Sequence, residues 1–316
     1  MGIERITERQ VIGTFYKTLS QDVGAAWINA VSNYFTSDQS SEEYAWFGQS
    51  SQMREWIGGR NAKGFRENGL TIANKHYEST IKYLVRDLRR DKTGQVMTRI
   101  QELARRTNSH WASLLSTLIL NGASTACYDN QYFFDTDHSE GSSGTQSNSI
   151  SVDISTLPLA VFGTTTAPAV GEMQFSIALA IQAIAGFKDD QGEPMNEDVN
   201  SFIVMVPVSL MNVAMQAVAT PVQVAETQSA LQALKSNFSI SVVPNARLTW
   251  TANFAVFRTD SYIKSFIRQE ETGVSLKVKG AGSEYEFDND AHQYGVDTWR
   301  NVGYGYWQNA CLVTMI

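Results

Sequence analysis

The pattern of apolar and polar positions predicts one unusually long β-strand in the first third of the chain. Between Leu70 and Leu88, β-forming residues recur among polar ones, and no proline interrupts the run. Nineteen extended residues would span roughly 60 Å, whereas a compact domain of about 200 residues has a radius of gyration of only ~16 Å. We therefore expect this strand either to bend sharply or to leave the body of the molecule.

The residues before this strand supply an antiparallel partner. Residues 44–57 carry several aromatic and aliphatic side chains, and glycines then mark a turn-rich tip between residues 58 and 69. The pattern predicts a long two-stranded ribbon, which is marginally stable in water unless it lies on another surface. We expect that surface to belong to a neighbouring copy of the chain. A hairpin packed on the chain's own core is the alternative that the pattern leaves open.

Helical spacing dominates the flanks of this ribbon. Thr7 and Gln10 form a capping box before an amphipathic helix, and a second apolar set between Trp27 and Phe35 predicts that the N-terminal arm holds one or two helices. Residues 95–120 predict a helix roughly 39 Å long, which Asn121-Gly122 ends with a left-handed stop.

Strands and helices alternate in the second half of the chain, which predicts an α+β sub-domain over residues 171–260. Strands follow, with a closing strand pair that returns to the first sub-domain. The expected helices cover 171–187, 209–217 and 222–235, and the expected strands cover 202–207, 239–243, 254–257, 274–278, 284–287 and 299–316.

Composition narrows the class of protein. The 316 residues are 43% hydrophobic, which suffices for a sizeable core in one large or two modest domains. The sequence contains no run of eighteen apolar residues and no apolar segment of a secretory signal at its start, so we expect no membrane partner. Two cysteines make no disulfide framework, and the chain is expected to be cytosolic and reduced at synthesis.

Charge is distributed unevenly along the chain. The net charge is −7, which argues against a dedicated nucleic-acid binder. Residues 1–110 hold 16 Lys and Arg against 12 Asp and Glu, a net of +4, whereas the remainder carries 9 against 20, a net of −11. A basic arm on an acidic body suits contact between identical subunits, and a solvated positive face is the plainer interpretation.

Three short motifs bear a family resemblance. They are Met53-Arg54-Glu55-Trp56-Ile57-Gly58-Gly59-Arg60, Thr71-Ile72-Ala73-Asn74-Lys75 with Tyr77-Glu78, and Cys127-Tyr128-Asp129 ahead of Phe133-Phe134-Asp135-Thr136-Asp137-His138. Together they resemble the major head subunits of Mu-like transposable phages. The resemblance implies the α+β Hong Kong 97 capsid fold, with an N-terminal arm, an extended two-stranded loop, a peripheral domain containing a long spine helix, and an axial domain.

The resemblance also implies domain boundaries. The N-terminal arm is expected over 1–43, the extended hairpin loop over 44–91 and the first part of the peripheral domain over 92–170. The axial domain is expected over 171–262, and residues 263–316 are expected to return to the peripheral domain as strands.

The function that this resemblance implies is structural rather than enzymatic. The chain would self-assemble, as pentamers and hexamers of identical subunits, into the icosahedral shell of a tailed phage that encloses double-stranded DNA. Scaffold and portal proteins are implied partners, a decoration protein is a further candidate, and packaged DNA would be contacted non-specifically. The protein would reside in the virion capsid after assembly in the host bacterial cytoplasm, and it needs no cofactor.

Candidate contact residues follow from this hypothesis. The predicted contacts comprise the arm residues Met53, Arg54, Trp56, Arg60, Tyr77 and Tyr83, the N-terminal-arm residues Phe15, Tyr16 and Trp27, and an acidic counter-surface of Glu284, Glu286 and Asp288. Aromatic residues and arginine are enriched at protein interfaces, and we expect Arg54, Arg60 or Arg86 to pair with the acidic set.

Other functions remain open at this level. Asp135, Asp137 and His138 offer carboxylate and imidazole ligands close together, so a metal-dependent hydrolase is the main alternative. No second histidine at ligand spacing and no paired Cys-x-x-Cys accompanies them, and we predict no metal site. Another self-assembling phage protein, such as a tail component, is the third hypothesis. The sequence contains no G-x-S-x-G elbow and no phosphate-binding glycine loop.

Overall fold

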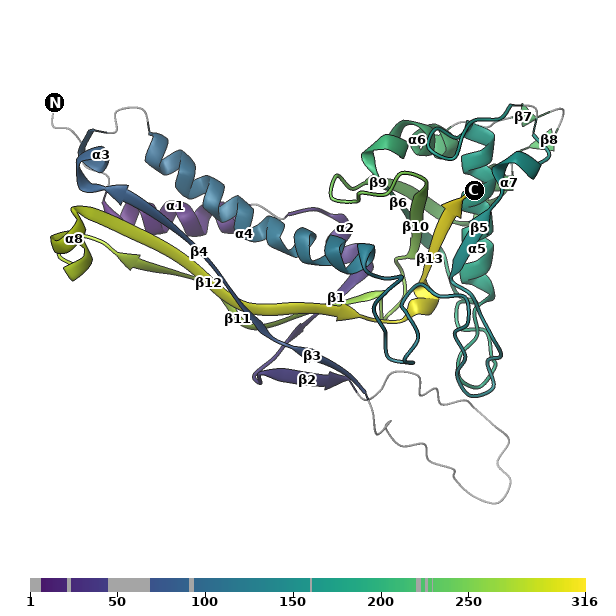
Figure 1. The fold of residues 1–316 in the computed structure, drawn as a ribbon, viewed down its shortest axis with the longest axis horizontal. Helices are drawn as coiled ribbons and strands as arrows, with labels where there is room; N and C mark the ends of the chain where they lie inside the picture. The colour runs from purple at the N-terminus through teal and green to yellow at the C-terminus, as the bar shows by residue number, and fades with distance from the viewer. Residues whose placement is uncertain are drawn as a thin grey trace, which may run out of the picture.

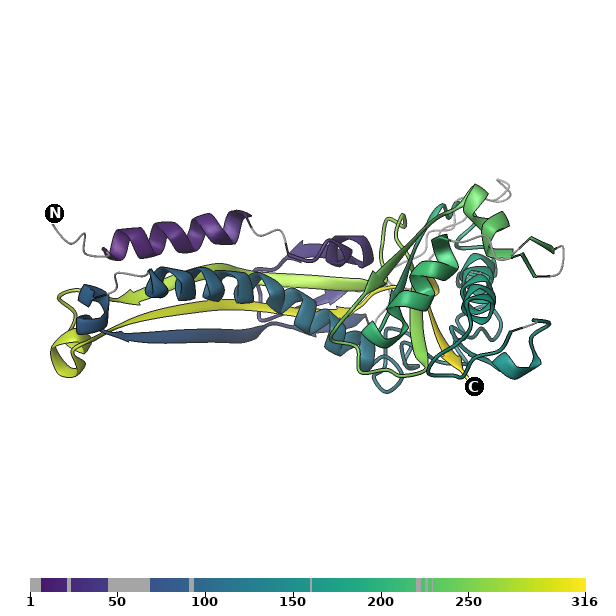
Figure 2. The same cartoon turned by 90° about the horizontal axis from the view of Figure 1, so that it is seen from above.

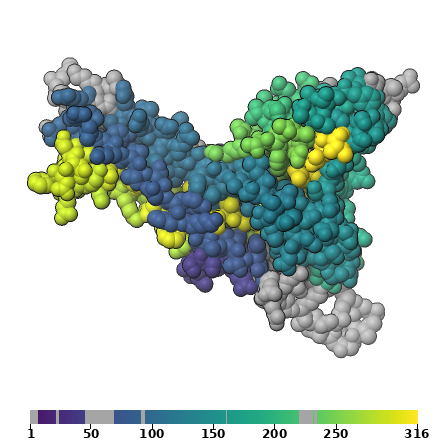
Figure 3. All heavy atoms as spheres, in the orientation of Figure 1, coloured from purple at the N-terminus to yellow at the C-terminus, as the bar shows by residue number. Residues whose placement is uncertain are grey.

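The chain folds into two halves, each built on its own β-sheet. The computed structural model describes residues 7–21, 24–44, 69–90, 94–159, 161–219, 223–224, 227–228 and 230–316. A long, narrow half carries the N-terminal helix and a compact half carries the C-terminus (Figure 1). In the space-filling view a notch separates the two halves along the upper edge (Figure 3).

The elongated half contains a four-stranded sheet in the order β1-β11-β12-β4, in which β1 runs parallel to β11 and the other pairs are antiparallel. Helix α4 lies over one face of this sheet, and α1 packs beside it (Figure 2). The elements are α1 (Glu8–Gln21), α2 (Trp27–Val31), β1 (Ser32–Thr36), β4 (Lys75–Leu84), α3 (Val85–Arg90), α4 (Gln95–Leu120), β11 (Phe266–Lys279), α8 (Glu284–Asn289) and β12 (Ala291–Tyr304).

A small core holds the outer part of the elongated half together, whereas its inner part, with Leu115 of α4 and Phe266 of β11, joins the large core of the compact half. Phe15 of α1, Ile100 of α4 and Tyr294 of β12 are each at most 1% exposed, and they belong to one hydrophobic cluster. These residues point from the helices and from one face of the sheet only. The burial of β12 alternates along the strand, as expected for a sheet with one face packed and the other open.

The compact half is built on a five-stranded sheet in the order β5-β13-β10-β6-β9. Strands β6, β10 and β13 are buried at almost every position, so both of their faces are covered. The elements are β5 (Ser149–Val152), η1 (Ile154–Thr156), α5 (Val170–Gly186), β6 (Ser201–Val206), η2 (Val208–Leu210), α6 (Met211–Ala219), β7 (Gln223–Val224), β8 (Thr227–Gln228), α7 (Ala230–Asn237), β9 (Ser239–Pro244), β10 (Asn253–Arg258), η3 (Trp307–Asn309) and β13 (Ala310–Met315).

The predicted long strand divides into two parts with different partners. Strand β3 (Leu70–Ala73) pairs with β2 (Ser41–Tyr44) in a two-stranded sheet that lies below the four-stranded sheet in Figure 1. After Asn74, β4 pairs residue by residue with β12 of the same chain. The chain therefore completes the second part itself, contrary to the expectation that the whole ribbon needs a neighbour. The predicted return leg beyond Tyr44 lies outside the described residues.

Several predicted elements are confirmed and others are wrong at their ends. The predicted capping box is present, because the Thr7 N–H donates to Gln10 Oε1 at 2.8 Å and the Gln10 N–H donates to Thr7 Oγ1 at 3.3 Å. The long helix spans 95–120 as predicted. Residues 85–88, predicted as strand, begin α3, because the buried Val85 and Leu88 are one helical turn apart. Residues 32–36, predicted as helix, form β1 instead.

The C-terminal segment also differs from the prediction. Strand β12 returns to the elongated half as expected, but β13 pairs with β10 and β5 in the compact half. The last strand therefore ties the chain end to the second sheet. Residues 284–287, predicted as strand, form α8, whose start is capped by Ser283 Oγ accepting from the Glu286 N–H at 3.2 Å.

Helix α4 ends where the sequence predicts, for a different physical reason. Asn121 has φ −86° and is not left-handed, and Gly122 does not have a positive φ. A Cβ at Gly122 would instead lie 2.5 Å from the ring of Phe134. Glycine is needed here because an aromatic ring packs directly on the backbone.

No helix among those described combines the length and apolar character that crossing a bilayer requires.

Candidate interaction surfaces

The predicted arm contacts fall into two groups. Met53, Arg54, Trp56 and Arg60 lie outside the described residues. Tyr77 and Tyr83 lie on β4. The Tyr83 side chain is 9% exposed and packs in the chain's own core, whereas Tyr77 is half-buried with its ring edge-on to His110 at 4.4 Å. Both rings therefore face α4 of their own chain, and a role in contacts between subunits stays a prediction.

The predicted N-terminal-arm contacts are distributed differently. Phe15 is fully buried and Trp27 is 8% exposed, and both pack within their own chain. Tyr16 is 41% exposed, although its hydroxyl accepts a hydrogen bond from the Leu276 N–H at 3.1 Å. Of these three residues, Tyr16 alone presents a substantial part of its ring to a partner.

The predicted acidic counter-surface lies on α8 at the far end of the elongated half (Figure 1). Glu284 and Asp288 are exposed. Glu286 accepts a hydrogen bond from the Gly282 N–H at 2.6 Å and faces His292 Nε2 at 3.0 Å, and these two groups lower the pKa of its carboxyl. Glu286 therefore has partners within its own chain, and Glu284 and Asp288 remain available for a neighbour.

The three residues of the predicted metal alternative do not converge. The Asp135 carboxylate accepts the N–H groups of Tyr132 at 3.1 Å and Thr136 at 2.8 Å. Asp137 is exposed, whereas the fully buried His138 points its Nδ1 at Asp129 Oδ2, 2.6 Å away. Asp135 therefore organises its own turn, and His138 is paired with a different carboxylate.

Cys127, Asp129 and His138 form the closest cluster of metal-ligating atoms in the described part of the chain. Burial, followed by the charge of Asp129, raises the pKa of the Cys127 thiol, which donates to Asp129 Oδ1 at 3.0 Å. Burial opposes ionisation of Asp129, but hydrogen bonds from His138 and Cys127 outweigh it and lower the pKa of that carboxyl.

The distances in this cluster are those of direct hydrogen bonds. Two ligand atoms held at ~2.0–2.1 Å from a tetrahedral zinc ion would lie about 3.3 Å apart, whereas His138 Nδ1 and Asp129 Oδ2 are 2.6 Å apart. A protonated thiol is also a poor ligand. The His138 ring stacks on Trp307 at 3.9 Å, so the cluster anchors the 127–148 region to the core.

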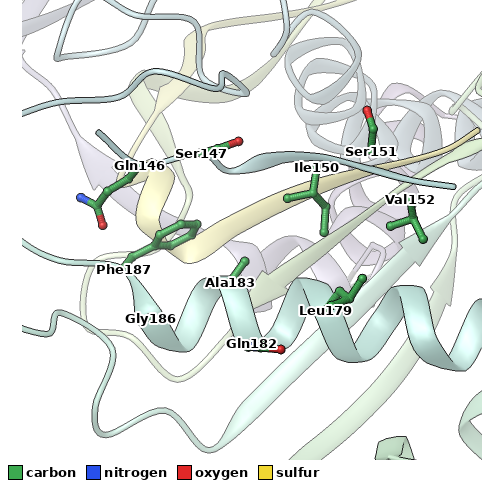
Figure 4. Close-up of a pocket in the computed structure, with 10 residues that line it drawn as sticks. All are labelled: Gln146, Ser147, Ile150, Ser151, Val152, Leu179, Gln182, Ala183, Gly186 and Phe187. Atoms are coloured by element: carbon green, nitrogen blue, oxygen red, sulfur yellow. The ribbon is translucent and has the colours of Figure 1, made fainter. Parts of the chain in front are cut away.

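One cavity lies between edge strand β5 and helix α5. It has a volume of about 440 Å³. Ile150 and Val152 of β5 face Leu179 and Ala183 of α5 across it (Figure 4). Its lining contains no acidic, basic, histidine or cysteine side chain. The cavity therefore offers no acid–base group, and its lining combines apolar side chains with the neutral polar groups of Gln146, Ser147, Ser151 and Gln182.

A second groove follows the sheet face that points away from α4. It has a volume of about 350 Å³ and is lined by β4, β11 and β12. Trp299, 40% exposed, stacks on His76 at 4.7 Å at one end of this face. Lys82 and Lys279 flank the ring of Tyr285 at the other end. This face carries charged residues of both signs, with two lysines at the Tyr285 end, unlike the cavity beside α5.

Several strongly exposed apolar side chains are not among the predicted contact residues. Phe287 of α8 is 92% exposed, Tyr262 is 91% exposed, and Val161 and Phe162 are 70% and 51% exposed. For Val161 and Phe162 a usable signal exists, because no charged residue occurs between Ile154 and Gly171. Large apolar groups held in water mark interaction sites when they cluster.

Comparison with known proteins identifies the family. A family model described as Mu-like prophage major head subunit gpT matches residues 8–167 and 237–314, about three quarters of the chain. The chain belongs to this family of phage head subunits. Its membership agrees with the motif resemblance and with the prediction of a structural protein rather than an enzyme, and it gives the metal-dependent hydrolase alternative no support.

Individual relatives cover less of the chain. The Mu-like prophage FluMu major head subunit of Haemophilus influenzae is 37% identical over 117 residues, which are 36% of this chain and 38% of that protein. The major capsid protein of Escherichia phage Mu is 31% identical over 110 residues, 35% of this chain and 36% of that protein. Each alignment therefore spans little more than a third of the relative's length.

The fold is shared over a longer stretch. The procapsid of bacteriophage JBD30 contains a chain with a TM-score of 0.55 and 22% identity, and the match covers 98% of this chain and 76% of that one. This head-subunit chain thus has the α+β, Hong Kong 97-like capsid fold that the motifs imply.

Proposed function

We propose that this chain is a major capsid subunit that self-assembles into the icosahedral shell of a tailed phage enclosing double-stranded DNA. The observation that carries the proposal is the match of the head-subunit family model to both halves of the molecule, over residues 8–167 and 237–314. In this proposal the elongated half is the peripheral domain and the compact half, including β5 and β13, is the axial domain.

The shape of the described residues supports such a role. Strands β2 and β3 form an antiparallel pair that packs on the chain's own core through Tyr44 and Ile72. A ribbon that extends from this pair, as the sequence predicts, would be marginal on its own, so a neighbouring subunit is a suitable support. Individually modest contacts of this kind add up over a closed shell, because head-to-tail interfaces that close generate rings.

The proposal assigns contact roles to residues at both ends of the ribbon. Met53, Arg54, Trp56 and Arg60 are the proposed contacts beyond the described part of the hairpin. Their counterparts are the exposed acidic residues of α8, Glu284 and Asp288, on an adjacent copy. Opposite charges would steer association and set the register of the subunits.

Further partners belong to the same proposal. Pentamers and hexamers of identical subunits would form the shell in the host bacterial cytoplasm, together with scaffold and portal proteins. A decoration protein would bind outside, and packaged DNA would be contacted non-specifically. The finished protein would reside in the virion capsid.

Light scattering on the purified chain, combined with negative-stain microscopy, tests the proposal. The expected result is closed shells, or rings that convert to shells when a scaffold is supplied. Tubes would instead favour a tail component, and a strictly monomeric chain at all concentrations would reject self-assembly.

A paired charge reversal tests the assigned contacts. Arg54→Glu with Arg60→Glu should leave a folded, soluble subunit that fails to form shells. In the variant that lacks residues 58–68, assembly should stop at free subunits or small rings, as sedimentation can measure. Arg99→Glu, an exposed arginine on α4, is the matched control. Normal shells from the paired reversal would reject the assignment.

A further inference from the structure

The loop over residues 161–169 presents adjacent apolar side chains to solvent in the compact half. Val161 is 70% exposed and Phe162 is 51% exposed. The chain is 18% charged, yet no Asp, Glu, Lys or Arg occurs from Ile154 to Gly171. Depletion of charge around an exposed aromatic residue is the composition of an interface centre rather than of an ordinary surface loop.

A buried carboxylate holds this loop in one shape. Glu172, fully buried at the start of α5, accepts the Gly163 N–H with both oxygens at 3.1 Å and the Ala169 N–H at 2.7 Å. Burying a charge is costly unless hydrogen bonds compensate it. The loop backbone provides these bonds, so the charge and the loop shape depend on each other.

The turn between these anchor points is equally specific. Thr164 and Ala167 exchange backbone hydrogen bonds, each 3.0 Å long. A Cβ at Gly163 would lie 2.3 Å from the Ala167 carbonyl oxygen, so a side chain at position 163 would force the turn open. Val161 and Phe162 are therefore displayed on a preformed support, which lowers the entropy lost when a partner covers them.

The chemistry of the loop restricts its partner. A loop without cationic side chains cannot neutralise phosphates, so nucleic acid does not suit it.

A second segment of the same chain also lacks charged residues and exposes apolar side chains. No charged residue occurs from Ser201 to Ala225, and within that stretch Val208 of η2 is 55% exposed and Met215 of α6 is 42% exposed.

We propose that the 161–169 loop of one copy packs against the η2–α6 surface of a second copy. This inference rests on the proposed function and deepens it, because it names one of the contacts between subunits. When the loop of each copy engages the η2–α6 surface of the next copy, the contact is head-to-tail and repeats around a ring. The rigid loop supplies the anchor, and the neutral helix surface receives it without desolvating a charge.

Removal of the anchor is the first test. Val161→Ser with Phe162→Ser should raise the subunit concentration needed for assembly by at least about tenfold, because two apolar side chains are no longer buried. The circular dichroism spectrum should be unchanged. Tyr262→Ser is the matched control, since Tyr262 is 91% exposed and its backbone oxygen keeps its hydrogen bond from Asn33. Assembly of the double variant at the wild-type concentration would overturn the inference.

Cross-linking tests the partner surface directly. Phe162→Cys and Val208→Cys in one chain, treated with a short bis-maleimide, should give a ladder of covalent multimers, whereas Phe162→Cys alone should not. The native Cys127 and Cys311 are buried and should not react. Shells that form normally without a ladder would overturn the inference and leave the proposed function intact. A wild-type chain that never assembles would overturn both.

Discussion

The two halves of this head subunit bury their sheets differently. In the compact half, β6 and β10 are buried at nearly every position. In the elongated half, β4 is largely exposed and β12 alternates between buried and exposed residues. A sheet covered on both faces carries its own stability, whereas a sheet covered on one face leaves a surface for water or for a neighbour.

This difference shows how one chain can combine a rigid body with a long extension. The outer part of the elongated half depends on one layer of contacts between α1, α4 and its sheet. Its other face is polar, with the His76–Trp299 stack at one end. A long sheet with one covered face extends far from the compact half but buries little apolar surface. Such a sheet suits a subunit whose open face is covered by a neighbour.

The largest expected effect lies in the compact half. Phe257 of β10 is fully buried, so Phe257→Ala should lower the free energy of unfolding by about 3–5 kcal/mol. Trp299→Ala, on the open face of the other sheet, should lower it by less than about 1 kcal/mol. Urea denaturation of unassembled subunits measures both. Equal losses would show that the two sheets are not packed as differently as their burial indicates.

The next effect concerns the end of α4, where the two halves join. Gly122→Ala would place a methyl group 2.5 Å from the Phe134 ring, and such overpacking should cost about 1–3 kcal/mol. Gly13→Ala in α1, where a Cβ meets no atom within 4 Å, should stabilise the elongated half by up to about 1 kcal/mol. Thermal unfolding compares the two, and a neutral Gly122→Ala would disprove the close-packing role.

A smaller effect depends on pH and on the covered face of the long sheet. Burial, followed by the charges of Arg300 and Arg247, lowers the pKa of His110 to about 4, and His110 Nδ1 accepts a hydrogen bond from Arg300 Nε at 3.1 Å. The unfolded chain protonates this histidine below about pH 6.5, so its contribution to stability is present above pH 6.5 and is lost as pH falls toward 4.

Because His110 is only partly buried, solvent screening limits this contribution to about 1 kcal/mol. His110→Gln keeps an acceptor for Arg300 but cannot be protonated. Between pH 6.5 and 4, the free energy of unfolding measured by urea denaturation should therefore fall by about 1 kcal/mol less in the variant than in the wild type. Parallel pH profiles of the two proteins would contradict a neutral, buried His110.

The smallest effect is expected on the open face. Lys277 is 74% exposed in its ion pair with Asp297, and exposed pairs contribute about 0.2–1 kcal/mol. Lys277→Ala should therefore change the unfolding midpoint of isolated subunits only slightly, and less in high salt, as differential scanning calorimetry can measure. A large loss would mean that the open face stabilises the elongated half more than its exposure indicates.

The predictions that held depend on local chemistry. The Thr7 capping box and the apolar spacing of α4 are readable because caps and helical periods involve residues three or four positions apart. The pattern predicts strands where the six-residue helices α3 and α8 lie, since so few residues do not separate a period of 3.6 from a period of 2.

The candidate site residues divide in the same way. The sequence identifies aromatic residues suited to interfaces, but Phe15 and Tyr83 turn out to fill their own core. Whether an aromatic ring points inward depends on the strand register and on the helix that lies above it. The exposed pair Val161 and Phe162 shows the converse case, since the run without charged residues marks their segment but only the folded loop places their side chains in solvent.

By itself, the sequence determined many of the helices and strands, the Thr7 cap, the uneven charge and the motifs of a head-subunit family, because these properties depend on neighbours along the chain. Only the tertiary structure decided that β4 pairs with β12, that β13 closes the second sheet, and that Glu172 locks the 161–169 loop. Those features join residues far apart in sequence or need a buried environment, and a linear pattern carries no information about which distant strand completes a sheet.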